Sequence, residues 1–562
     1  MTNPIKSSSA ELHNVILDAL GRLVANGKVD SCPIPVFNIE IPADKSHGDF
    51  ATNIAMVCAK AFKSAPRKIA ELITEEIVLD GTSFEKCEIA GPGFINFFLS
   101  KKWFSNVVSD VLNENDKYGR TDTGAGKKIL VEFVSANPTG PMHIGNARGG
   151  AIGDCLASVL DWAGYTVARE FYINDAGNQI EKFATSLEVR YLQLYKDGIE
   201  IPEDAYLGED IVQHAKNFAE IHGDKYVDAE SSERRNALVD FALPTNIQKL
   251  EDDLFKYRIV YDKWFRESYL HDSGAVKEII ELLKKSGYTY EQEGALWFKS
   301  SELGDEKDRV LVRANGIPTY FVPDISYHYN KLVTRGFDKA IDILGADHHG
   351  YIPRMKAALT ALGVDASRLD IVIMQMVRLV KNGEVYKLSK RSGKAVTLET
   401  LLDDVPIDAA RFFFNLREAN SHFEFDLDVA VEQSSNNPVF YVQYAHARIC
   451  SIFKALEADG IKPEKLTADK LCLLDSPEEI ELIRLMAAFP NTIDAAAKDY
   501  DPAKITRYSL DLATLFHKFY DKCRIKGEQE DILQARLSLC LAVRTVIRNA
   551  LTVLKITYPE KM

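Results

Sequence analysis

The chain has 562 residues, 46% of them hydrophobic and 27% charged, with a formal net charge of −14 at pH 7. This length allows three or four domains with large buried cores. No apolar run approaches the roughly 20 residues that span a bilayer, and the first residues lack the apolar core of a signal peptide, so we expect a cytoplasmic protein with no membrane partner. None of the eight cysteines forms a Cys-x-x-Cys pair, which argues against a thiolate zinc site and for reduced thiols. The acidic charge argues only weakly against a nucleic-acid partner, because charge can be segregated to one face of a large protein.

Residues 1–112 are predicted to form a small α/β unit. Apolar residues recur at helical spacing over 8–27, where Ser8 and Glu11 resemble a capping box. The other elements expected in this unit are two strands and an intervening helix, at 36–41, 94–99 and 50–62. The polar, glycine-containing run 113–128 is typical of a linker.

From residue 129 to about 427, strands and helices alternate, which predicts a parallel sheet with crossover helices. Candidates for buried strands occur at 129–135, 341–345 and 369–373. Between about 190 and 285 the chain is acidic and helical, and we interpret this stretch as an insertion. The fold class expected is therefore α/β, with a helical insertion in the central domain.

Residues 431–562 are predicted to form an α-helical bundle. The stretch 518–526 mixes basic and aromatic residues, a combination that contacts phosphates and stacks on bases. Solvent-exposed faces of ordinary helices would give the same pattern, so both interpretations stay open.

The stretch His143-Ile144-Gly145-Asn146 follows a strand candidate and precedes a helical pattern. A helix start carries unpaired N–H groups and partial positive charge, which suit phosphate. Gly145 removes a side chain where a nucleotide would lie against the backbone, and His143 and Asn146 add hydrogen-bond donors. The glycine spacing fits neither a Walker A loop nor a dinucleotide fingerprint. Alone, the tetrapeptide also fits a helix start with an incidental histidine.

A second segment, at 387–394, has the sequence KLSKRSGK. A cationic loop of this kind can close on the β- and γ-phosphates and offset the charge that builds on a leaving pyrophosphate. By itself it would equally be a solvated basic turn. One such element on each side of a long α/β stretch favours a shared nucleotide site.

The two segments resemble the signature elements of the class I aminoacyl-tRNA synthetases. His143–Asn146 is similar to the HIGH element, with asparagine in place of the last histidine. Lys387–Arg391 is similar to KMSKS, with Arg391 where a serine is commoner. The resemblance implies a Rossmann-type domain that activates an amino acid with ATP and esterifies it to tRNA.

Longer blocks narrow the resemblance to the arginyl enzymes, over nearly the whole chain. These blocks are residues 48–53, 91–96, 132–146, 320–328, 345–351 and 437–448. They imply an additional N-terminal domain that contacts tRNA over 1–112, a catalytic domain over 113–430 with its insertion at about 190–285, and an anticodon-binding helical domain over 431–562. The tRNA-binding residues expected are Tyr444, Arg448, Lys522 and Arg524.

The resemblance also implies an arginine site. The guanidinium group is always charged and presents planar donors, so its pocket needs carboxylates and a hydroxyl. By resemblance, Glu132, Asp324 and Tyr320 hold the guanidinium, while Asn137 and Ser135 orient the α-amino end. For Glu132 alone, a structural salt bridge is the alternative.

Catalytic roles are expected for His143, Asn146, Lys387 and Lys390. The residues expected to bind ATP are His143, Gly145, Asn146, Gly345, Asp347, His348, Lys387, Ser389 and Lys390. The adjacent His348 and His349 could instead bind a metal, but no further ligands cluster nearby in the sequence. We expect no protein-bound metal, with Mg²⁺ entering as the counter-ion of ATP.

The implied reaction joins L-arginine to tRNA(Arg) through an arginyl-adenylate and releases AMP and pyrophosphate; we expect a monomer. The resemblance also implies that tRNA must be bound before arginine is activated. Three alternatives stay open: a synthetase for another amino acid, a tRNA-binding protein that has lost catalysis, and a smaller nucleotidyltransferase that acts without tRNA. A synthetase for another amino acid would lack the paired carboxylates Glu132 and Asp324. A tRNA-binding protein without catalysis would tolerate the loss of His143, Gly145 and Lys390. A nucleotidyltransferase that acts without tRNA would have no use for the two terminal domains.

Overall fold

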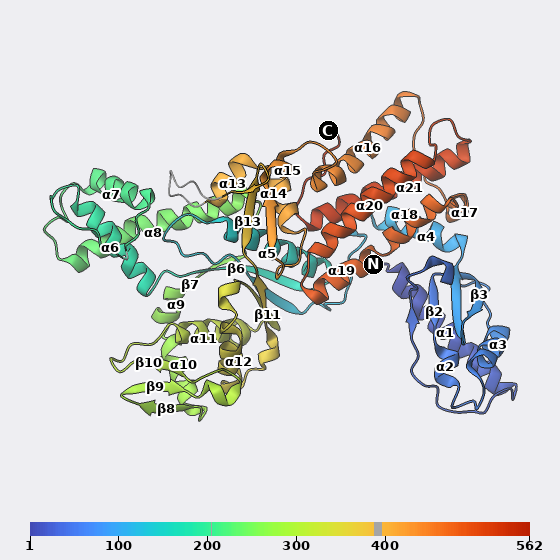
Figure 1. Cartoon of the computed structure of the whole chain (residues 1–562), viewed down its shortest axis with the longest axis horizontal. Helices are drawn as coiled ribbons and strands as arrows, with labels where there is room; N and C mark the ends of the chain where they lie inside the picture. The colour runs from blue at the N-terminus through green and yellow to red at the C-terminus, as the bar shows by residue number, and fades with distance from the viewer. Residues whose placement is uncertain (204, 387–395) are drawn as a thin grey trace.

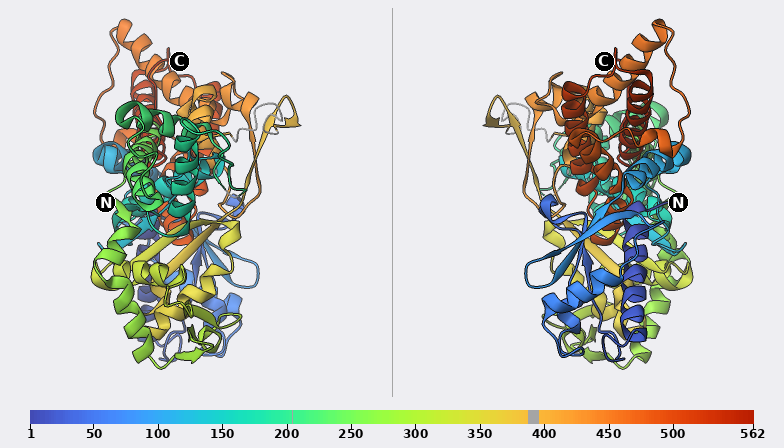
Figure 2. Two further views of the ribbon diagram at one scale, coloured as in Figure 1. Left: turned by 90° about the vertical axis from the view of Figure 1, so that its left-hand side faces the viewer. Right: turned by 90° about the vertical axis from the view of Figure 1, so that its right-hand side faces the viewer.

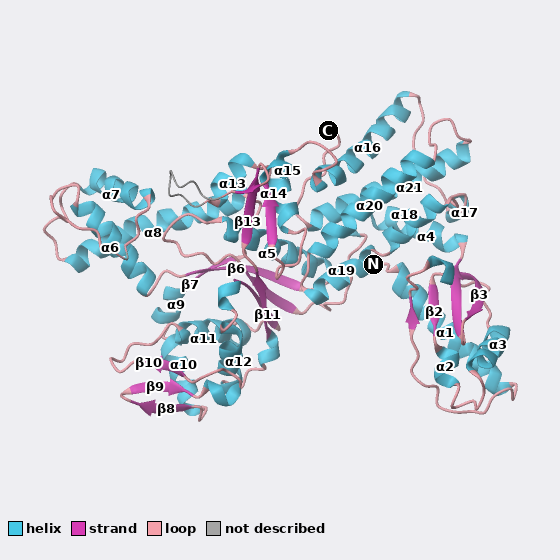
Figure 3. Ribbon diagram, viewed as in Figure 1, coloured by secondary structure: helices cyan, strands magenta, loops and turns pink. Residues whose placement is uncertain are grey.

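A five-stranded parallel sheet lies at the centre of the molecule (Figure 1). The computed structural model describes residues 1–203, 205–386 and 396–562. The C-terminal helices and the N-terminal unit lie on one side of this centre, and a lobe of three helices lies on the other (Figures 1 and 3). The α/β class with a helical C-terminal domain, as the sequence predicts, is confirmed.

The N-terminal unit is an antiparallel sheet, in the order β1-β2-β4-β3, covered by helices. Its elements are α1 (Pro4–Ala25), β1 (Ile39–Glu40), β2 (Phe50–Thr52), α2 (Ile54–Cys58), α3 (Pro66–Glu76), β3 (Phe84–Ala90), β4 (Phe94–Leu99) and α4 (Lys101–Glu114). The helix expected at 50–62 is wrong at its start, because Phe50–Thr52 pairs with β4 as a strand. The expected capping box is also wrong: the Asn3 side chain caps α1 by accepting from the Lys6 N–H, while the buried Ser8 hydroxyl accepts from the Trp103 indole.

The central sheet has the strand order β12-β11-β5-β6-β7, and all its strands are parallel. Its strands are β5 (Lys128–Glu132), β6 (Thr166–Ile173), β7 (Lys263–Arg266), β11 (Lys339–Gly345) and β12 (Leu369–Met374). The chain leaves β5 toward β6 and later returns to β11 on the other side of β5, which creates a topological switch point at the carboxyl ends of β5 and β11. In open α/β sheets, ligands bind in the crevice at such a point.

Helix α5 (Ile144–Trp162) connects β5 to β6 and packs unusually close to the sheet. A Cβ at Gly153 would lie 2.2 Å from the Phe133 ring, so only glycine permits this approach. The glycines of this helix therefore help to fix where its N-terminus lies.

Two excursions of the chain extend from the sheet. The first contains α6 (Asn178–Leu192), α7 (Glu209–His222) and α8 (Ser231–Lys256), which share a small core of their own. The range 190–285 expected for the insertion also includes β7, which belongs to the parallel sheet. The second excursion, between β7 and β11, contains α9 (Glu267–Asp272), α10 (Ala275–Lys285), β8 (Thr289–Gln292), β9 (Ala295–Phe298), β10 (Arg309–Val312) and α11 (Phe321–Tyr329).

After β11, the chain forms α12 (Tyr351–Ala361), β12 and a strand pair that extends from the body of the molecule (Figure 2). The elements of this part are β13 (Val377–Lys381), β14 (Glu384–Val385), α13 (Leu398–Asp404), α14 (Ile407–Phe414), β15 (Phe423–Asp426) and α15 (Leu427–Val431). Strand β15 pairs in parallel with β13, so the chain after the second signature segment returns to the strand that precedes it.

The C-terminal bundle consists of α16 (Pro438–Ala458), α17 (Ala468–Leu471), α18 (Pro477–Ala487), α19 (Phe489–Asp499), α20 (Ala503–Lys522) and α21 (Glu530–Val553). Helices α19 and α21 pack against α5. The fully buried Arg411 joins this bundle to the sheet domain by donating to the Asp154 carboxylate at 2.6 Å and to the Leu554 carbonyl at 3.3 Å. Over the described ranges, no helix has the length and apolarity needed to cross a membrane.

Candidate active site

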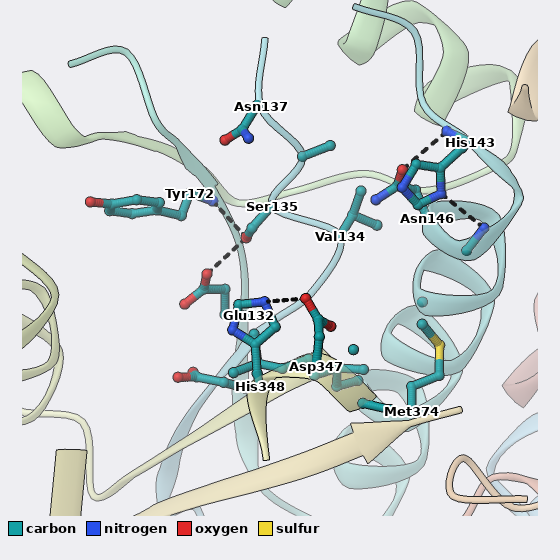
Figure 4. Close-up of a pocket in the computed structure, with 18 of the residues that line it drawn as sticks. Glu132, Val134, Ser135, Asn137, His143, Asn146, Tyr172, Asp347, His348 and Met374 are labelled. Carbon is teal, nitrogen blue, oxygen red and sulfur yellow. Dashed lines mark hydrogen bonds and ion pairs between the residues drawn. The ribbon is translucent and has the colours of Figure 1, made fainter. Parts of the chain in front are cut away.

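A cavity of about 1280 Å³ opens at the switch point of the sheet (Figure 4). Its walls come from the carboxyl ends of β5, β11 and β12, from the N-terminus of α5, and from the loop and first turn of α7. The lining includes most of the residues that the sequence singles out, namely Glu132, Ser135, Asn137, His143, Gly145, Asn146, Asp324, Gly345, Asp347 and His348. Residues that are far apart in the sequence therefore share one cavity.

At one end of the cavity, His143 and Asn146 cap α5. His143 Nδ1 accepts a hydrogen bond from the Gly145 N–H at 3.1 Å, and Asn146 Oδ1 accepts from the His143 N–H at 3.0 Å (Figure 4). Because Nδ1 acts as an acceptor, a neutral imidazole carries its proton on Nε2. Partial burial of the ring lowers the pKa of His143, which favours this neutral form. No described residue accepts a side-chain hydrogen bond from His143 Nε2 or Asn146 Nδ2, so both nitrogens can donate to a ligand.

The first backbone N–H groups of α5 are already engaged. Gly145 donates to His143, and Ile144 donates to the carbonyl of Val396 at 3.1 Å. The expectation that this helix start offers unpaired backbone donors is therefore wrong for these two residues. A phosphate would meet the side-chain donors of the cap and the positive end of the helix dipole.

The chain that follows the second signature segment lies directly against this cap. Besides the bond from Ile144 to Val396, Leu398 N–H donates to the Met142 carbonyl at 2.8 Å, and His143 and Thr397 form an antiparallel bridge. The predicted residues Lys387, Ser389 and Lys390 lie outside the described residues. Their neighbours from 396 onward are nevertheless attached to the start of α5.

The end of β11 forms another wall of the cavity. Asp347 and His348 are exposed there and form an ion pair with an N···O distance of 3.5 Å when the imidazole is protonated. A Cβ at Gly345 would lie 2.6 Å from an Asp347 carboxylate oxygen, so a side chain at Gly345 would displace it. His349 is not part of the cavity lining. Across the part of the chain that the structure describes, no three His, Cys, Asp or Glu side chains gather in a group able to hold a metal.

The loop after β5 contains two residues in left-handed conformations, Val134 with φ +70° and Ser135 with φ +42°. Such angles are strained for a β-branched residue and are common at functional sites. The turn places the Ser135 hydroxyl so that it donates to Glu132 Oε1 at 2.8 Å and accepts from the Tyr172 N–H at 3.1 Å (Figure 4).

The opposite end of the cavity is acidic. Asp324 lies in the first turn of α11, and no described residue donates a hydrogen bond to its carboxylate. Burial raises its pKa to about 7; His328 lowers the pKa, while Glu267 and Glu132 raise it further. Glu267 is buried at the start of α9 and accepts from the Tyr172 hydroxyl at 2.8 Å. A cation placed beside Asp324 would relieve this cost of ionisation.

The second carboxylate predicted for the site, Glu132, is already paired. Its Oε2 accepts from the Nζ of Lys331 at 2.5 Å, and the same Nζ donates to Asp342 Oδ1 at 2.8 Å. Asp342 Oδ2 lies 2.6 Å from His328 Nε2. The two carboxylates and Lys331 thus form a closed, buried network in the cavity wall.

Tyr320 and Asn137 lie farther out than the acidic residues. Tyr320 is 50% exposed, its hydroxyl accepts from the Asn178 N–H at 3.2 Å at the start of α6, and it is not part of the cavity lining. Asn137 is exposed on the cavity wall (Figure 4).

Comparisons with known proteins agree with this geometry. Residues 107–449 match the family model described as tRNA synthetases class I (R), catalytic domain. Residues 10–99 match the arginyl tRNA synthetase N terminal domain, and residues 442–562 match the DALR anticodon binding domain. The arginine–tRNA ligase of Caldanaerobacter subterraneus subsp. tengcongensis is 55% identical over 100% of both chains. The chain belongs to the arginine–tRNA ligases.

A second relative, the arginine–tRNA ligase of Ruminiclostridium cellulolyticum, is 54% identical over 98% of both chains. The arginyl-tRNA synthetase structure of Thermus thermophilus shares the fold, with a TM-score of 0.73 at 22% identity over 99% of this chain and 100% of that chain. ATP-dependent charging of tRNA with arginine is therefore the activity of this ligase. The three alternative functions that the sequence left open are not supported.

In the C-terminal domain of this ligase, two of the expected tRNA-binding residues lie together. The guanidinium of Arg448 lies 4.7 Å from the Tyr444 ring centroid and 5.1 Å from that of Tyr520, and it donates to the Tyr444 hydroxyl at 2.8 Å. A hollow of about 240 Å³ is lined by Ser435, Phe440, Tyr441, Tyr444, Arg448 and His517. Lys522 ends α20 and Arg524 follows it, and both are exposed outside this hollow.

Sequence reasoning missed three residues of the acidic end: Tyr172, Glu267 and Lys331. Glu267 directly follows β7, so an acidic residue at the carboxyl end of a buried strand was an available signal. No local pattern distinguishes Lys331 from a surface lysine, because its burial is a tertiary effect.

Proposed function

We propose that this ligase activates arginine within the single cavity, with the guanidinium at the acidic end and the ATP phosphates at the start of α5. One observation supports this arrangement above the others. The same cavity joins a carboxylate without a described hydrogen-bond donor, Asp324, to a capped helix start that keeps two side-chain N–H donors. A cationic side chain and a polyphosphate require these opposite environments.

At the acidic end, Asp324 binds the guanidinium, and Glu267 and Tyr172 form the wall behind it. Because both oxygens of Glu132 already accept hydrogen bonds, its contribution is chiefly the negative field and the orientation of Ser135. Ser135 and the exposed Asn137 then contact the α-amino end of the substrate. The Tyr320 hydroxyl would have to turn from the Asn178 N–H in order to reach the guanidinium.

In the first step, the arginine carboxylate attacks the α-phosphorus of ATP in line, forming the arginyl-adenylate and releasing pyrophosphate. A carboxylate is already anionic, so no general base is needed and catalysis consists of positioning and charge stabilisation. His143 Nε2 and Asn146 Nδ2 donate to phosphate oxygens, with Gly145 close to the adenosine. Gly345, Asp347 and His348 form the ribose and adenine side of the site.

The basic segment supplies the remaining charge in this proposal. Lys387, Ser389 and Lys390 meet the pyrophosphate as it leaves, an assignment supported by the bonds that attach Val396 and Leu398 to the start of α5. ATP enters as its Mg²⁺ complex, and the ion offsets charge on the phosphate oxygens that carry it.

In the second step, the terminal 2′-hydroxyl of tRNA(Arg) attacks the adenylate carbonyl and AMP leaves. We propose that Tyr444 and Arg448 bind the anticodon region by stacking and phosphate contact, with Lys522 and Arg524 adding positive charge. The N-terminal unit, residues 1–112, supplies a second tRNA contact. The catalytic domain then spans 113–430 and the anticodon domain 431–562, in a cytoplasmic monomer.

The decisive experiment is arginine-dependent exchange of pyrophosphate into ATP, measured with tRNA present. Lys390→Ala should slow adenylate formation far more than it weakens arginine binding, because Lys390 acts on the leaving group. The matched variant Lys381→Ala, at the exposed end of β13, should change neither quantity. Equal losses of rate and of arginine affinity in Lys390→Ala would contradict the role of the loop.

A further inference from the structure

Lys331 is a fully buried lysine at the acidic end of the cavity of this ligase. It lies in a π-helical turn, Asn330–Thr334, that continues α11, and its surface is 0% exposed. Lysine is almost never fully buried unless it is paired. Its ammonium group lies 2.5 Å from Glu132 Oε2, 2.8 Å from Asp342 Oδ1 and 4.1 Å from the centre of the Tyr327 ring. A buried cation in the wall of this site is unexpected, because it would repel a cationic substrate.

The ammonium group stays charged in this position. Burial alone would lower the pKa of Lys331, but Asp342 and Glu132 outweigh it and raise the pKa. Burial would likewise raise the pKa of Asp342, yet Lys331 and His328 hold it far below its usual range. The network therefore contains an ammonium and ionised Asp342 at neutral pH.

All four oxygens of the two carboxylates have partners. Glu132 accepts from Lys331 and Ser135, and Asp342 accepts from Lys331 and contacts His328. The carboxylate of Asp324 differs, because no described residue donates to it. The acidic wall thus contains two carboxylates that share one ammonium group, a third, Glu267, that accepts from the Tyr172 hydroxyl, and Asp324, to which no described residue donates.

We propose that Lys331 is a positioning and specificity-determining residue that occupies Glu132 and Asp342, so that Asp324 is the carboxylate left for the guanidinium. This inference rests on the proposed arginine end of the cavity. In this arrangement Asp324 is the carboxylate at the acidic end without a donor among the described residues, so it is the one available to the planar donors of a guanidinium. The bond from Lys331 also fixes the second oxygen of Glu132 toward Ser135, and so fixes the position of the α-amino contacts.

Loss of the ammonium group would disturb both the pairing of Glu132 and Asp342 and the position of the α-amino contacts. Glu132 and Asp342 accept from the same nitrogen, so without it two like charges would face each other in a buried wall. Such carboxylates share a proton, and the pair acquires an ionisation that the parent protein lacks. The freed carboxylates would turn toward an incoming cation and compete with Asp324 for the guanidinium.

The charged and titratable groups around this network come from every neighbouring element, so the pH dependence of a variant must be interpreted against all of them. Besides Lys331, these groups are Glu132 on β5, Glu170 and Tyr172 on β6, Tyr261 before β7, Glu267 on α9, Asp324, Tyr327 and His328 on α11, Asp342 on β11, and Tyr351 and Arg354 on α12.

The first experiment compares Lys331→Met with Lys339→Met in the full-length enzyme. Lys339, at the opposite end of β11, is also bonded to a carboxylate and a tyrosine hydroxyl, but it lies outside the cavity. Lys331→Met should raise the KM for arginine by about 100-fold, leave the KM for ATP within about threefold, and add an ionisation between about pH 5 and 8 to the profile of kcat/KM for arginine. Lys339→Met should show none of these changes, and Lys331→Arg should recover most of the arginine affinity.

Charge balance is separated from a purely structural role by the double variant Lys331→Met/Asp342→Asn. It removes one positive and one negative charge, so the net charge of the wall returns to its original value. The double variant should bind arginine at least tenfold more tightly than Lys331→Met and lose the additional ionisation. Removal of the second partner relieves an uncompensated buried charge, so the unfolding temperature should recover in the double variant for either role. Only the charge-balance role also requires that the KM for arginine recovers while the KM for ATP stays unchanged.

The outcomes distinguish this inference from the proposed function. An unchanged KM for arginine in Lys331→Met, or equal rises for arginine and ATP, would overturn the role of Lys331. If Lys331→Met does not fold, the inference is tested with the double variant and with Lys331→Arg. A double variant that folds without binding arginine would also overturn the role of Lys331. Asp324→Asn is measured in parallel, and an unchanged KM for arginine in that variant would instead contradict the proposed arginine end itself.

Discussion

The two ends of the active-site cavity satisfy their polar groups in different ways. At the acidic end, Glu132, Asp342 and Lys331 are buried and bonded to one another across β5, β11 and the turn after α11. At the start of α5, the side chains of His143 and Asn146 bond to the backbone of their own turn. A network that joins three elements is rigid, whereas a local cap can exchange its partners when a ligand arrives.

This difference suits the two substrates. Arginine must be told apart from other amino acids of similar size, which requires donors and acceptors held in advance. The triphosphate changes its charge distribution as pyrophosphate leaves, so flexible donors and an approaching basic segment are appropriate. The acidic end is therefore expected to govern arginine affinity, and the capped helix start is expected to govern the rate of the chemical step.

The largest effect is expected for Asp324→Asn. The substitution removes the charge complement of the guanidinium, so the KM for arginine should rise by about 100-fold or more, while the KM for ATP changes little. Steady-state pyrophosphate exchange with tRNA present measures both constants. Asp347→Asn, in the same cavity but at the nucleotide side, is the matched control and should show the reverse pattern. Equal effects of the two variants would remove the distinction between the ends.

The same variant should be more stable than the parent enzyme. Burial raises the pKa of Asp324 to about 7, so ionisation costs the folded state free energy that the unfolded state does not lose. This cost is absent below about pH 4, grows between pH 4 and 7, and is complete above pH 7. Asp324→Asn should therefore stabilise the ligand-free protein at pH 8 by on the order of 1 kcal/mol, measured by thermal or urea unfolding. If Asp324→Asn unfolded at a lower temperature than the parent enzyme at pH 8, other interactions of the folded protein would have to stabilise the ionised Asp324 carboxylate.

His143→Ala tests the other end of the cavity. Loss of the Nε2 donor should reduce the rate of adenylate formation by about 100-fold, with a smaller change in the KM for arginine. Single-turnover formation of the adenylate, with tRNA bound, separates rate from affinity. His143→Gln supplies an amide donor and should recover part of the rate. A predominant effect on arginine affinity would mean that His143 does not act on phosphate.

Arginine affinity should also depend on pH. Asp324 is neutral below about pH 7, so each unit of decrease in pH from 7 to 5 should raise the KM for arginine by up to about tenfold, and the value should be constant above pH 8. The KM for ATP should not follow this profile. Asp324→Asn provides the control, because its arginine KM should lack the transition near pH 7.

The smallest effect is expected for Asn146→His, which restores the residue that is usual at this position of the HIGH element. The asparagine already donates toward the cavity, so the rate should change by less than about threefold. The capping bond to the His143 N–H is weakened, and the unfolding free energy should fall by about 0.5–1 kcal/mol. A gain of more than tenfold in rate would show that Asn146 does not replace the imidazole.

Much of the fold follows from local sequence patterns. The strands β11 and β12 begin and end within two residues of the apolar runs expected at 341–345 and 369–373, because strands buried on both faces need continuous apolar sequence. Strand β5 begins one residue before the run expected at 129–135 and ends three residues before the end of that run. The helix expected at 50–62 failed at its start, since Phe50–Thr52 pairs with β4 and the pairing outweighs local helical spacing. Ser8 was misassigned as a cap because its true partner, Trp103, is 95 residues away.

For the site, the sequence by itself determined which residues carry donors and charges: the His143 and Asn146 cap, the carboxylates Glu132 and Asp324, and the alternation of strands and helices that brings them to one edge of a sheet. Only the tertiary structure decided which of those charges remain open to a ligand. Glu132 is paired with a lysine 199 residues away, whereas no described residue donates to the Asp324 carboxylate. The physical reason is that electrostatic interactions depend on distance in space and on exclusion of water, and neither quantity is local in the sequence.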